Sequence, residues 1–305
     1  MSELISVIIT THNRVELLKQ AIGSVKNQTY RNLECFIIDD ASDYDIRPEV
    51  EGLMDERFQL IQIPKSESGG SNYARNLGIK RSQGQYIALL DDDDTWEVEK
   101  LEKQVNSLQQ VGDARISYCL RRFVYHNGAC DYEQYHTGQE GDCSRKIFYS
   151  IIGTTSSLMI EANLLKEELF DKKLQFWQEY DVMIRLCQKT KVVCVKEHLV
   201  NYLVNMHDKE RKTNQYEEWL LSVKFIDEKY HTFIQQLTEE EKQKKELLFY
   251  GDACNRLYLS GRKKERRKYF KAMYRISRNK KHLVKYLFNI DRIDIWHMKS
   301  RLLGK

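Results

Sequence analysis

The first 115 residues alternate between short continuous apolar runs and segments in which apolar residues recur at helical spacing. The runs have the pattern of strands buried on both faces, and they span Ser6–Ile9, Leu33–Ile38, Phe58–Ile63 and Tyr86–Leu90. The segments with helical spacing lie between and after these runs; one carries Val15, Leu18, Ile22 and Val25. This order predicts an α/β fold with a doubly wound, mainly parallel sheet.

Polar residues at the start of the segments with helical spacing predict where helices begin. Asn13 with Glu16 three residues later forms a capping box, so we expect a helix after the first strand. Asp94 is placed to cap a second helix that would span Trp96–Gln110. The buried face of that helix would carry Val98, Leu101, Val105 and Leu108.

The pattern after residue 115 is less regular and turns helical near residue 214. Before that point we expect strands at Ser117–Tyr125 and Thr155–Ile160, a helix at Asp181–Lys189 and an edge strand at Val192–Val195. Beyond it, one helical face carries Trp219, Val223, Ile226 and Tyr230. Thr238 and Glu241 form a capping box, and Gly261 ends the helix over Leu247–Leu259. A last basic helix extends to about Asn279. We therefore expect a domain over residues 1–212, with halves 1–115 and 116–212, and a helical extension over 213–305.

Composition indicates an ordinary folded protein. Hydrophobic residues make up 41% of the chain and there are only 2 prolines. The apolar runs are strand-sized and shorter than the roughly 18 residues of a membrane span, and the first of them starts too early for a signal peptide. The 7 cysteines are scattered and show no zinc spacing, which favours reduced thiols in a cytoplasmic protein.

The net charge of +4 conceals a strong asymmetry. Residues 261–305 hold 16 Lys and Arg against 3 Asp and Glu, so the rest of the chain is acidic. Such a basic segment can contact anionic surfaces, and with the interspersed aromatic and aliphatic residues it favours peripheral contact of residues 262–305 with an anionic membrane. A solvated face of a docked helical hairpin is the alternative, and no base-reading motif suggests a nucleic-acid partner.

Four consecutive carboxylates, Asp91–Asp94, follow directly after the fourth apolar run. In an open α/β sheet, ligands bind outside the carboxyl ends of the strands, which is where this cluster would lie. Oxygen ligands of this kind suit Mg²⁺ or Mn²⁺, which bind through one or two carboxylates together with substrate phosphates. The alternative is a solvated acidic loop.

Other polar groups at strand ends are expected to converge on the same crevice. Thr10 and Thr11 follow the first run, and Asp40 follows the second. A carboxylate such as Asp40 can accept from the N–H of a uracil, whereas Arg14, Arg75 and the Gly69–Gly70 backbone can bind a pyrophosphate. A simple turn with Ser42 as a cap is the alternative for the Asp39–Asp40 segment.

Five motifs resemble those of family 2 glycosyltransferases in order and spacing. They span Ser6–Arg14, Gln28–Tyr30, Ile38–Ser42, Ala74–Gly78 and Leu90–Trp96. The resemblance covers residues 4–110 and returns at 176–186. It implies the GT-A fold, with a Rossmann-like nucleotide-binding half (1–115) and a mixed acceptor half (116–212), and an inverting transfer from a nucleotide sugar.

The resemblance also implies roles for individual residues. Asp93 would ligate the metal, Asp92 would face the ribose, and Asp91 would support the site or join the metal's water shell. The middle residue of the motif is itself an aspartate here, which leaves open which carboxylate touches metal. Contacts with the donor are implied for Thr10, Thr11, Asn13, Arg14, Asp40, Ser42, Gly70, Arg75, Asn76 and Asp92.

The segment Trp177–Leu186 resembles the acidic motif that carries the general base in this family. Glu179 matches the base position, one methylene longer than the usual Asp, and its alternative role is a helix cap. Asp181 and Arg185 are spaced as a structural ion pair. His207 lies near a segment where relatives carry a histidine by the donor phosphates, although Asn205 occupies the expected position.

Together these patterns favour an enzyme that transfers a hexose from a nucleotide sugar, in particular a UDP-sugar, with Mn²⁺ or Mg²⁺. The acceptor would be a hydroxyl of a saccharide or lipid-linked saccharide in the synthesis of a cell-surface polysaccharide or glycoconjugate, at the cytoplasmic face of the plasma membrane. A nucleotidyltransferase and a non-catalytic nucleotide- or sugar-binding module are the alternatives. The identity of the sugar, the linkage and the oligomeric state do not follow from these residues.

Overall fold

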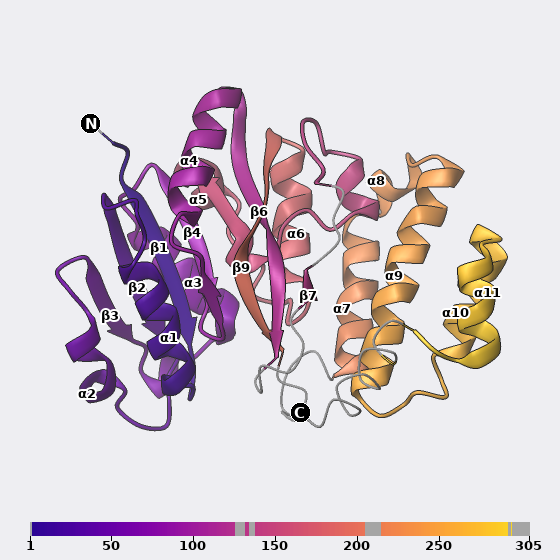
Figure 1. Cartoon of the computed structure of the whole chain (residues 1–305), viewed down its shortest axis with the longest axis horizontal. Coiled ribbons are helices and arrows are strands. Elements are labelled where there is room, and N and C mark those ends of the chain that lie inside the picture. The colour runs from indigo at the N-terminus through magenta and orange to yellow at the C-terminus, as the bar shows by residue number, and fades with distance from the viewer. Residues whose placement is uncertain (1, 126–131, 134–137, 205–214, 292–293, 295–305) are drawn as a thin grey trace.

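The protein is described from a computed structural model, which covers residues 2–125, 132–133, 138–204, 215–291 and 294. Its centre is one mixed sheet with helices on both faces (Figure 1). The strands are β1 (Ile5–Thr11), β2 (Leu33–Asp39), β3 (Phe58–Gln62), β4 (Tyr86–Asp91), β5 (Asp94–Trp96), β6 (Ala114–Tyr125), β7 (Tyr132–Glu133), β8 (Leu158–Glu161) and β9 (Lys191–Val204). Their order is β3-β2-β1-β4-β8-β6-β9-β5, with β7 beside β6.

The N-terminal half of the sheet is parallel and the second half is mixed. β1 pairs in parallel with β2 and β4, and β2 pairs in parallel with β3. β8 then runs antiparallel to both β4 and β6, whereas β6 and β9 are parallel. The expected α/β fold, with a Rossmann-like half and a mixed half, is confirmed.

Helices cover both faces of the parallel half, which explains why its strands are continuously apolar. On one face α1 (Val15–Lys26) and α4 (Lys100–Val111) pack in the same cluster as Val7 and Ile9 of β1. On the other face α3 (Gly70–Arg81) packs against Ile8. A Cβ on Gly78 would lie 2.6 Å from a methyl of Ile8, so glycine is needed for this close approach. The remaining short helices of this domain are α2 (Arg47–Val50), α5 (Ala162–Glu167) and α6 (Gln178–Cys187).

The C-terminal helices form a separate layer beyond the mixed half of the sheet (Figure 1). They are α7 (Tyr216–Lys229), α8 (His231–Gln235), α9 (Glu239–Leu259), α10 (Arg267–Ser277) and α11 (Lys280–Phe288). Trp219 of α7 and Leu257 of α9 share an apolar cluster with Phe176, which precedes α6. The capping box of Thr238 and Glu241 is confirmed, and Gly261 has the positive φ of a helix stop. None of the helices that the structure describes is long and apolar enough to cross a membrane.

Several local predictions were wrong because tertiary contacts replaced the local signal. Asp94 starts strand β5, which pairs with β9, so α4 begins only at Lys100 and Val98 is exposed. Val192–Val195 pairs with β6 on one side and has only an isolated bridge from Val192 to Gly141 on the other, but it belongs to the longer strand β9, whose later residues Val200–Tyr202 lie between β6 and β5. The basic helix that was expected to extend to about Asn279 is present as α10, which ends at Ser277, whereas α11 was not predicted.

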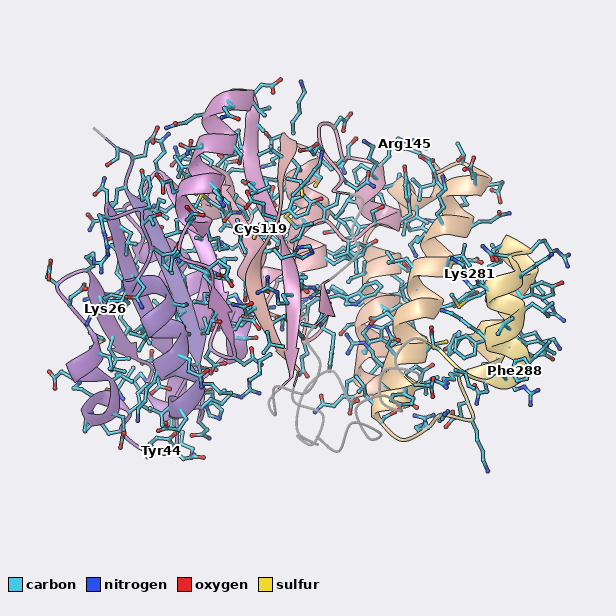
Figure 2. The ribbon with its side chains drawn as sticks, in the orientation of Figure 1. Lys26, Tyr44, Cys119, Arg145, Lys281 and Phe288 are labelled. Atoms are coloured by element: carbon cyan, nitrogen blue, oxygen red, sulfur yellow. The ribbon has the colours of Figure 1, made fainter. Side chains whose placement is uncertain are left out.

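Figure 2 shows how the side chains fill the layers between these elements, with Cys119 inside the sheet region and Lys281 and Phe288 at the outer end of the C-terminal helices. The six cysteines among the described residues are buried and unpaired, at positions 35, 119, 143, 187, 194 and 254. Each of the six lies in one of the apolar core clusters. Cys130 lies outside the described residues.

Candidate active site

A cavity of about 830 Å³ opens at the carboxyl ends of β1 and β4 and is lined from three parts of the chain. The parallel half contributes Thr10, Arg14, Asp40, Arg75 and Asp91–Asp94, among others. The mixed half contributes Arg121, Ser156 and Glu179, and α9 of the C-terminal helices contributes Asp252 and Arg256. The polar side chains that follow the parallel strands therefore meet in one cavity, as expected for the carboxyl ends of a parallel sheet.

The two loops that follow β1 and β2 beside this cavity are tied together by side chains. Asn13 has a φ of 56°, and its backbone N–H donates to Ser42 Oγ at 2.8 Å. The amide of Asp43 in turn donates to Asn13 Oδ1 at 2.8 Å. Asn13 is therefore not the cap of α1, as its capping-box pattern predicted; Arg14 holds that position, and Asn13 joins the loops after β1 and β2.

Asp40 is buried and lines the cavity. Its carboxylate accepts from the backbone N–H of Gly69 at 3.2 Å, and its carbonyl lies 2.8 Å from His12 Nδ1. Gly70, which opens α3, has a φ of 78° and also lines the cavity. The helix start, the carboxylate and the β1 loop therefore meet at one place.

Each of the four consecutive aspartates has a different environment. Asp91 accepts from Arg75 at 2.6 Å, and Asp94 accepts from Ser156 Oγ at 2.6 Å. Asp92 accepts from Thr11 Oγ1 at 2.7 Å, and Arg14 lies 3.5 Å from Asp92 and 3.4 Å from Asp93.

The electrostatics of this cluster favour a cation. Burial, and secondly the charge of Asp93, raises the pKa of Asp92 to about 7, although Arg14 and Thr11 act in the opposite direction. No three His, Cys, Asp or Glu side chains converge as a ready-made metal cage within the described residues. Mg²⁺ and Mn²⁺ commonly bind through one or two carboxylates and complete their shell with water and phosphate oxygens, so the residues present fit such an ion.

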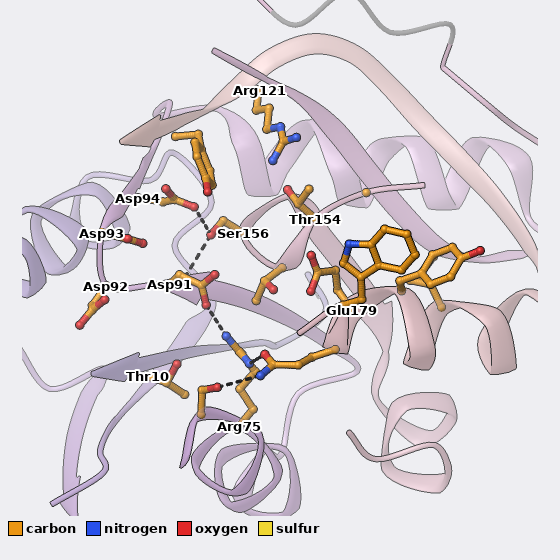
Figure 3. Close-up of a pocket in the computed structure, with 18 of the residues that line it drawn as sticks. Thr10, Arg75, Asp91, Asp92, Asp93, Asp94, Arg121, Thr154, Ser156 and Glu179 are labelled. Carbon is orange, nitrogen blue, oxygen red and sulfur yellow. Dashed lines mark hydrogen bonds and ion pairs between the residues drawn. The ribbon is translucent and has the colours of Figure 1, made fainter. Parts of the chain in front are cut away.

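Glu179 lies in the first turn of α6 and lines the cavity across from Asp91 (Figure 3). The residue before α6, Trp177, has a φ of 54°, which turns the chain sharply into the helix. Burial raises the pKa of Glu179 above its ordinary value, and the charge of Asp91 adds to this, whereas Arg75 and Arg121 oppose it. The carboxylate is therefore a stronger base than an exposed glutamate.

Residues 6–161, slightly more than half of the chain, match the family model for glycosyl transferase family 2. The chain belongs to this family. The resemblance that the sequence motifs indicated is thereby confirmed, and the cavity is the candidate active site of a glycosyltransferase.

The relatives of this glycosyltransferase include bacterial and archaeal proteins. An uncharacterized glycosyltransferase of Rickettsia prowazekii, RP339, is 26% identical over 79% of this chain and 74% of its own length. WcaA of Escherichia coli, named for colanic acid biosynthesis, is 33% identical over 60% of this chain and 66% of its own. TuaG of Bacillus subtilis, named for teichuronic acid biosynthesis, is 36% identical over 35% of this chain and 42% of its own.

Solved structures of Staphylococcus aureus TarS have a similar fold. Residues 1–349 of TarS in complex with UDP-GlcNAc match with a TM-score of 0.56 at 14% identity, over 97% of this chain and 92% of that one. The same TarS segment in complex with UDP matches with a TM-score of 0.55. At this level of identity the similarity establishes the fold of this glycosyltransferase.

The structure brings together most of the residues that the sequence predicted as site residues. Those that line the cavity are Thr10, Thr11, Asn13, Arg14, Asp40, Gly70, Arg75, Asp91, Asp92, Asp93 and Glu179. Ser42 and Asn76, for which donor contacts were also expected, are not among the lining residues. Ser42 bonds to Asn13 and Asp39, and Asn76 exchanges two hydrogen bonds with the backbone of Phe170, so both position the elements around the site. His207 and Asn205 lie outside the described residues.

Sequence reasoning missed several residues of this glycosyltransferase site. Arg121 lies on β6 and borders the cavity near Asp94 and Thr154 (Figure 3). A signal was available, because charged residues are unusual within a buried strand such as Ser117–Tyr125. Asp252 and Arg256 of α9 had no comparable signal, because their helical surroundings resemble any solvated helix.

Proposed function

We propose that this family 2 glycosyltransferase transfers a hexose from a UDP-sugar to a saccharide hydroxyl, with inversion at the anomeric carbon and with Mn²⁺ or Mg²⁺. One observation carries the proposal: the Asp91–Asp93 cluster and the base candidate Glu179 face the same cavity from opposite sides (Figure 3). This arrangement suits a donor diphosphate on one side and an acceptor hydroxyl on the other.

The donor is proposed to bind at the loops after β1, β2 and β4. Asp40 is placed to accept from a uracil N–H, and Arg14 can neutralise part of the diphosphate charge. The named TarS complexes with UDP and UDP-GlcNAc support a uridine diphosphate donor in this fold. A bound Mn²⁺ or Mg²⁺, held by Asp93 and Asp91, would supply positive charge that offsets the charge developing on the leaving diphosphate.

The transfer itself needs one displacement. Glu179 takes the proton of the acceptor hydroxyl as the acceptor oxygen forms its bond to the anomeric carbon. The bond from that carbon to the diphosphate oxygen breaks, and UDP leaves with the electron pair. Attack from the face opposite the leaving group inverts the configuration, so no protein nucleophile is required.

The acceptor is proposed to be a saccharide, free or lipid-linked, that is extended during synthesis of a cell-surface polysaccharide or glycoconjugate. The names of WcaA and TuaG, which refer to colanic acid and teichuronic acid biosynthesis, support this class of pathway. A lipid-linked acceptor would place the enzyme at the cytoplasmic face of a membrane.

The C-terminal helices offer a surface for such a membrane. One face of α11 exposes Lys280 and Lys281 followed by Val284, Leu287 and Phe288, and Phe288 is 67% exposed. Exposed apolar side chains next to lysines favour shallow insertion into an anionic bilayer. We therefore propose that α11 is the membrane-contacting part of the basic segment 262–305.

Release of UDP is the decisive test of the proposed activity. We expect the protein with Mn²⁺ to release UDP slowly from one of UDP-glucose, UDP-galactose or UDP-N-acetylglucosamine, because water can replace the acceptor. A nucleotidyltransferase would instead release pyrophosphate from a nucleoside triphosphate in the presence of a sugar phosphate. A non-catalytic binding module would bind UDP and release none from the sugar nucleotide, and that result would contradict the proposal.

A further inference from the structure

Asp252 of α9 presents a carboxylate to the acceptor side of the active-site cavity, although it lies in the helical extension outside the family match. Its Oδ2 atom accepts from Trp177 Nε1 at 3.0 Å and from Arg256 Nε at 3.0 Å. Its Oδ1 atom has no partner among the described residues, and the side chain is 28% exposed. One oxygen is therefore held in place while the other is available to a ligand.

Both donors that hold Asp252 are themselves fixed by aromatic packing. The ring of Trp177 makes edge contacts with Tyr180, Trp219 and Phe249 at centroid distances of 4.9, 5.8 and 5.0 Å. The guanidinium of Arg256 lies 5.5 Å from the centre of the Phe176 ring and 5.3 Å from that of Trp219. The direction of the carboxylate is thus set before any ligand arrives, which reduces the entropy lost on binding.

The chemistry at this end of the cavity suits a neutral, hydroxylated ligand. An oriented carboxylate accepts hydrogen bonds from hydroxyl groups, and the aromatic ring of Trp177, which also borders the cavity, can pack against the apolar face of a sugar ring. The charge of Asp252 is offset here by Arg256, whereas Arg14 lies beside the acidic cluster, where it can meet a diphosphate. Trp177 is only two residues from Glu179, so a ligand bound here lies beside the base.

We propose that Asp252 and Trp177 form an acceptor subsite that binds a ring hydroxyl of a saccharide next to the hydroxyl that Glu179 deprotonates. This inference rests on the proposed glycosyl transfer and specifies where the acceptor is recognised. It also gives the C-terminal helices a direct role in the reaction, since α9 completes a cavity that the family 2 segment leaves open on that side. Asp252 is then a specificity-determining residue for the acceptor.

The test compares Asp252→Asn with wild type in two reactions on the full chain. One is UDP release from the sugar nucleotide without acceptor, and the other is transfer to para-nitrophenyl glycosides of glucose, galactose and N-acetylglucosamine. We expect kcat/KM for the best glycoside to fall about 10- to 100-fold, mainly through KM, because a hydrogen bond to a charged group is lost. UDP affinity and acceptor-independent UDP release should stay at wild-type values.

Two further variants guard against a general structural effect. Trp177→Phe keeps an aromatic ring but loses the N–H that orients Asp252, and it should raise KM for the glycoside without changing UDP affinity. Glu240→Gln, on the exposed side of the same helix and paired with Lys244, should behave as wild type.

The outcomes separate this inference from the proposed function. Wild-type transfer kinetics in Asp252→Asn, or an equal loss in both reactions, would overturn the acceptor subsite. A wild-type enzyme that releases UDP yet transfers to none of the glycosides and shows no saturation transfer from protein to glycoside protons by NMR would also overturn it. Absence of UDP release from every sugar nucleotide in the wild type would contradict the proposed function itself.

Discussion

Arg75 of α3 forms an ion pair with Asp91 at 2.6 Å, and the same guanidinium reaches α6, the helix that carries Glu179. Its Nη1 atom donates to Gln178 Oε1 at 2.9 Å, directly before Glu179 in the chain. The arginine is buried, and Gln178 is held further by the backbone carbonyl of Gln175 at 2.8 Å. One side chain therefore connects the carboxylate cluster to the residue beside Glu179, so we propose that Arg75 positions Glu179 and also supplies positive charge near the donor.

Replacement of Arg75 by lysine should lower kcat about tenfold or more while the protein remains folded. A lysine keeps the charge but cannot span Asp91 and Gln178 at once, and small misplacement of reacting groups costs up to about 10² in rate. Steady-state UDP release and a thermal melt would measure this. Arg81→Lys, at the exposed end of the same helix, is the matched control. A wild-type kcat in Arg75→Lys would show that the connection to Gln178 is unimportant.

The acidic cluster predicts that UDP binding depends on a divalent ion. Asp93→Ala should abolish turnover and leave the melting curve close to wild type, because Asp93 lines the cavity and forms its ion pair with Arg14, whose side chain is 38% exposed. Calorimetry of UDP binding with Mn²⁺ and with excess EDTA should show tighter binding with the metal. Equal affinity under the two conditions would rule out the metal role.

The position of Glu179 predicts a general-base defect on substitution. Glu179→Gln should lower kcat by about 10² or more with UDP affinity nearly retained. Because the pKa of Glu179 is raised and the base must be deprotonated, kcat of the wild type should fall as the pH drops through that raised pKa. NMR of the glycoside product should show an inverted anomeric centre. A retained configuration would exclude the single displacement.

The exposed face of α11 predicts salt-sensitive binding to anionic vesicles. Full-length protein should sediment with phosphatidylglycerol-containing vesicles at low salt, and less at high salt, because each lysine near the surface contributes about 1 kcal/mol. Replacing Val284, Leu287 and Phe288 by serine should reduce sedimentation with vesicles. Leu221→Ser, at an exposed position of α7, should not. Wild-type protein that stays in the supernatant at low salt would disprove membrane contact.

Because of the buried Lys100, we expect the free energy of unfolding to rise with pH above neutrality. It is fully buried, its ammonium lies 3.9 Å from the centre of the Trp96 ring, and it donates to Gln104 at 2.6 Å. Burial lowers the pKa of Lys100 from 10.5 to about 8. Unfolding therefore takes up a proton between about pH 8 and 10.5, so the free energy of unfolding rises with pH across that window.

The variant Lys100→Met should flatten this pH dependence. At pH 7 it should be more stable than wild type by up to about 3 kcal/mol, reduced by the hydrogen bond to Gln104 that is lost. The difference should shrink as the pH rises through 8 to 10. Urea unfolding at several pH values would measure it. Lys103→Met on the same helix is the control, because the ion pairs of Lys103 raise its pKa out of this window. If the free energy of unfolding depends on pH equally in both variants, Lys100 is not the source of the pH dependence.

The sequence by itself determined the parallel half of the protein and much of its site. The apolar runs that became β1, β2, β3 and β4 are continuous because helices cover both faces, and that signal is local in the chain. The carboxyl ends of parallel strands share one edge, so Thr10, Asp40 and Asp91 were expected together and do meet there. Glu179 likewise lies in a helix start that its own segment defines.

Only the tertiary structure decided the roles that depend on contacts between distant segments. Asn13 and Asp94 look like helix caps in sequence, yet one bonds to Ser42 and the other starts a strand that pairs with β9. Asp252 looks like a residue of a solvated helix, yet Trp177 turns it toward the cavity. Local periodicity records which face of an element is buried, but the partner that buries it is chosen by long-range packing, and no short stretch of sequence contains that choice.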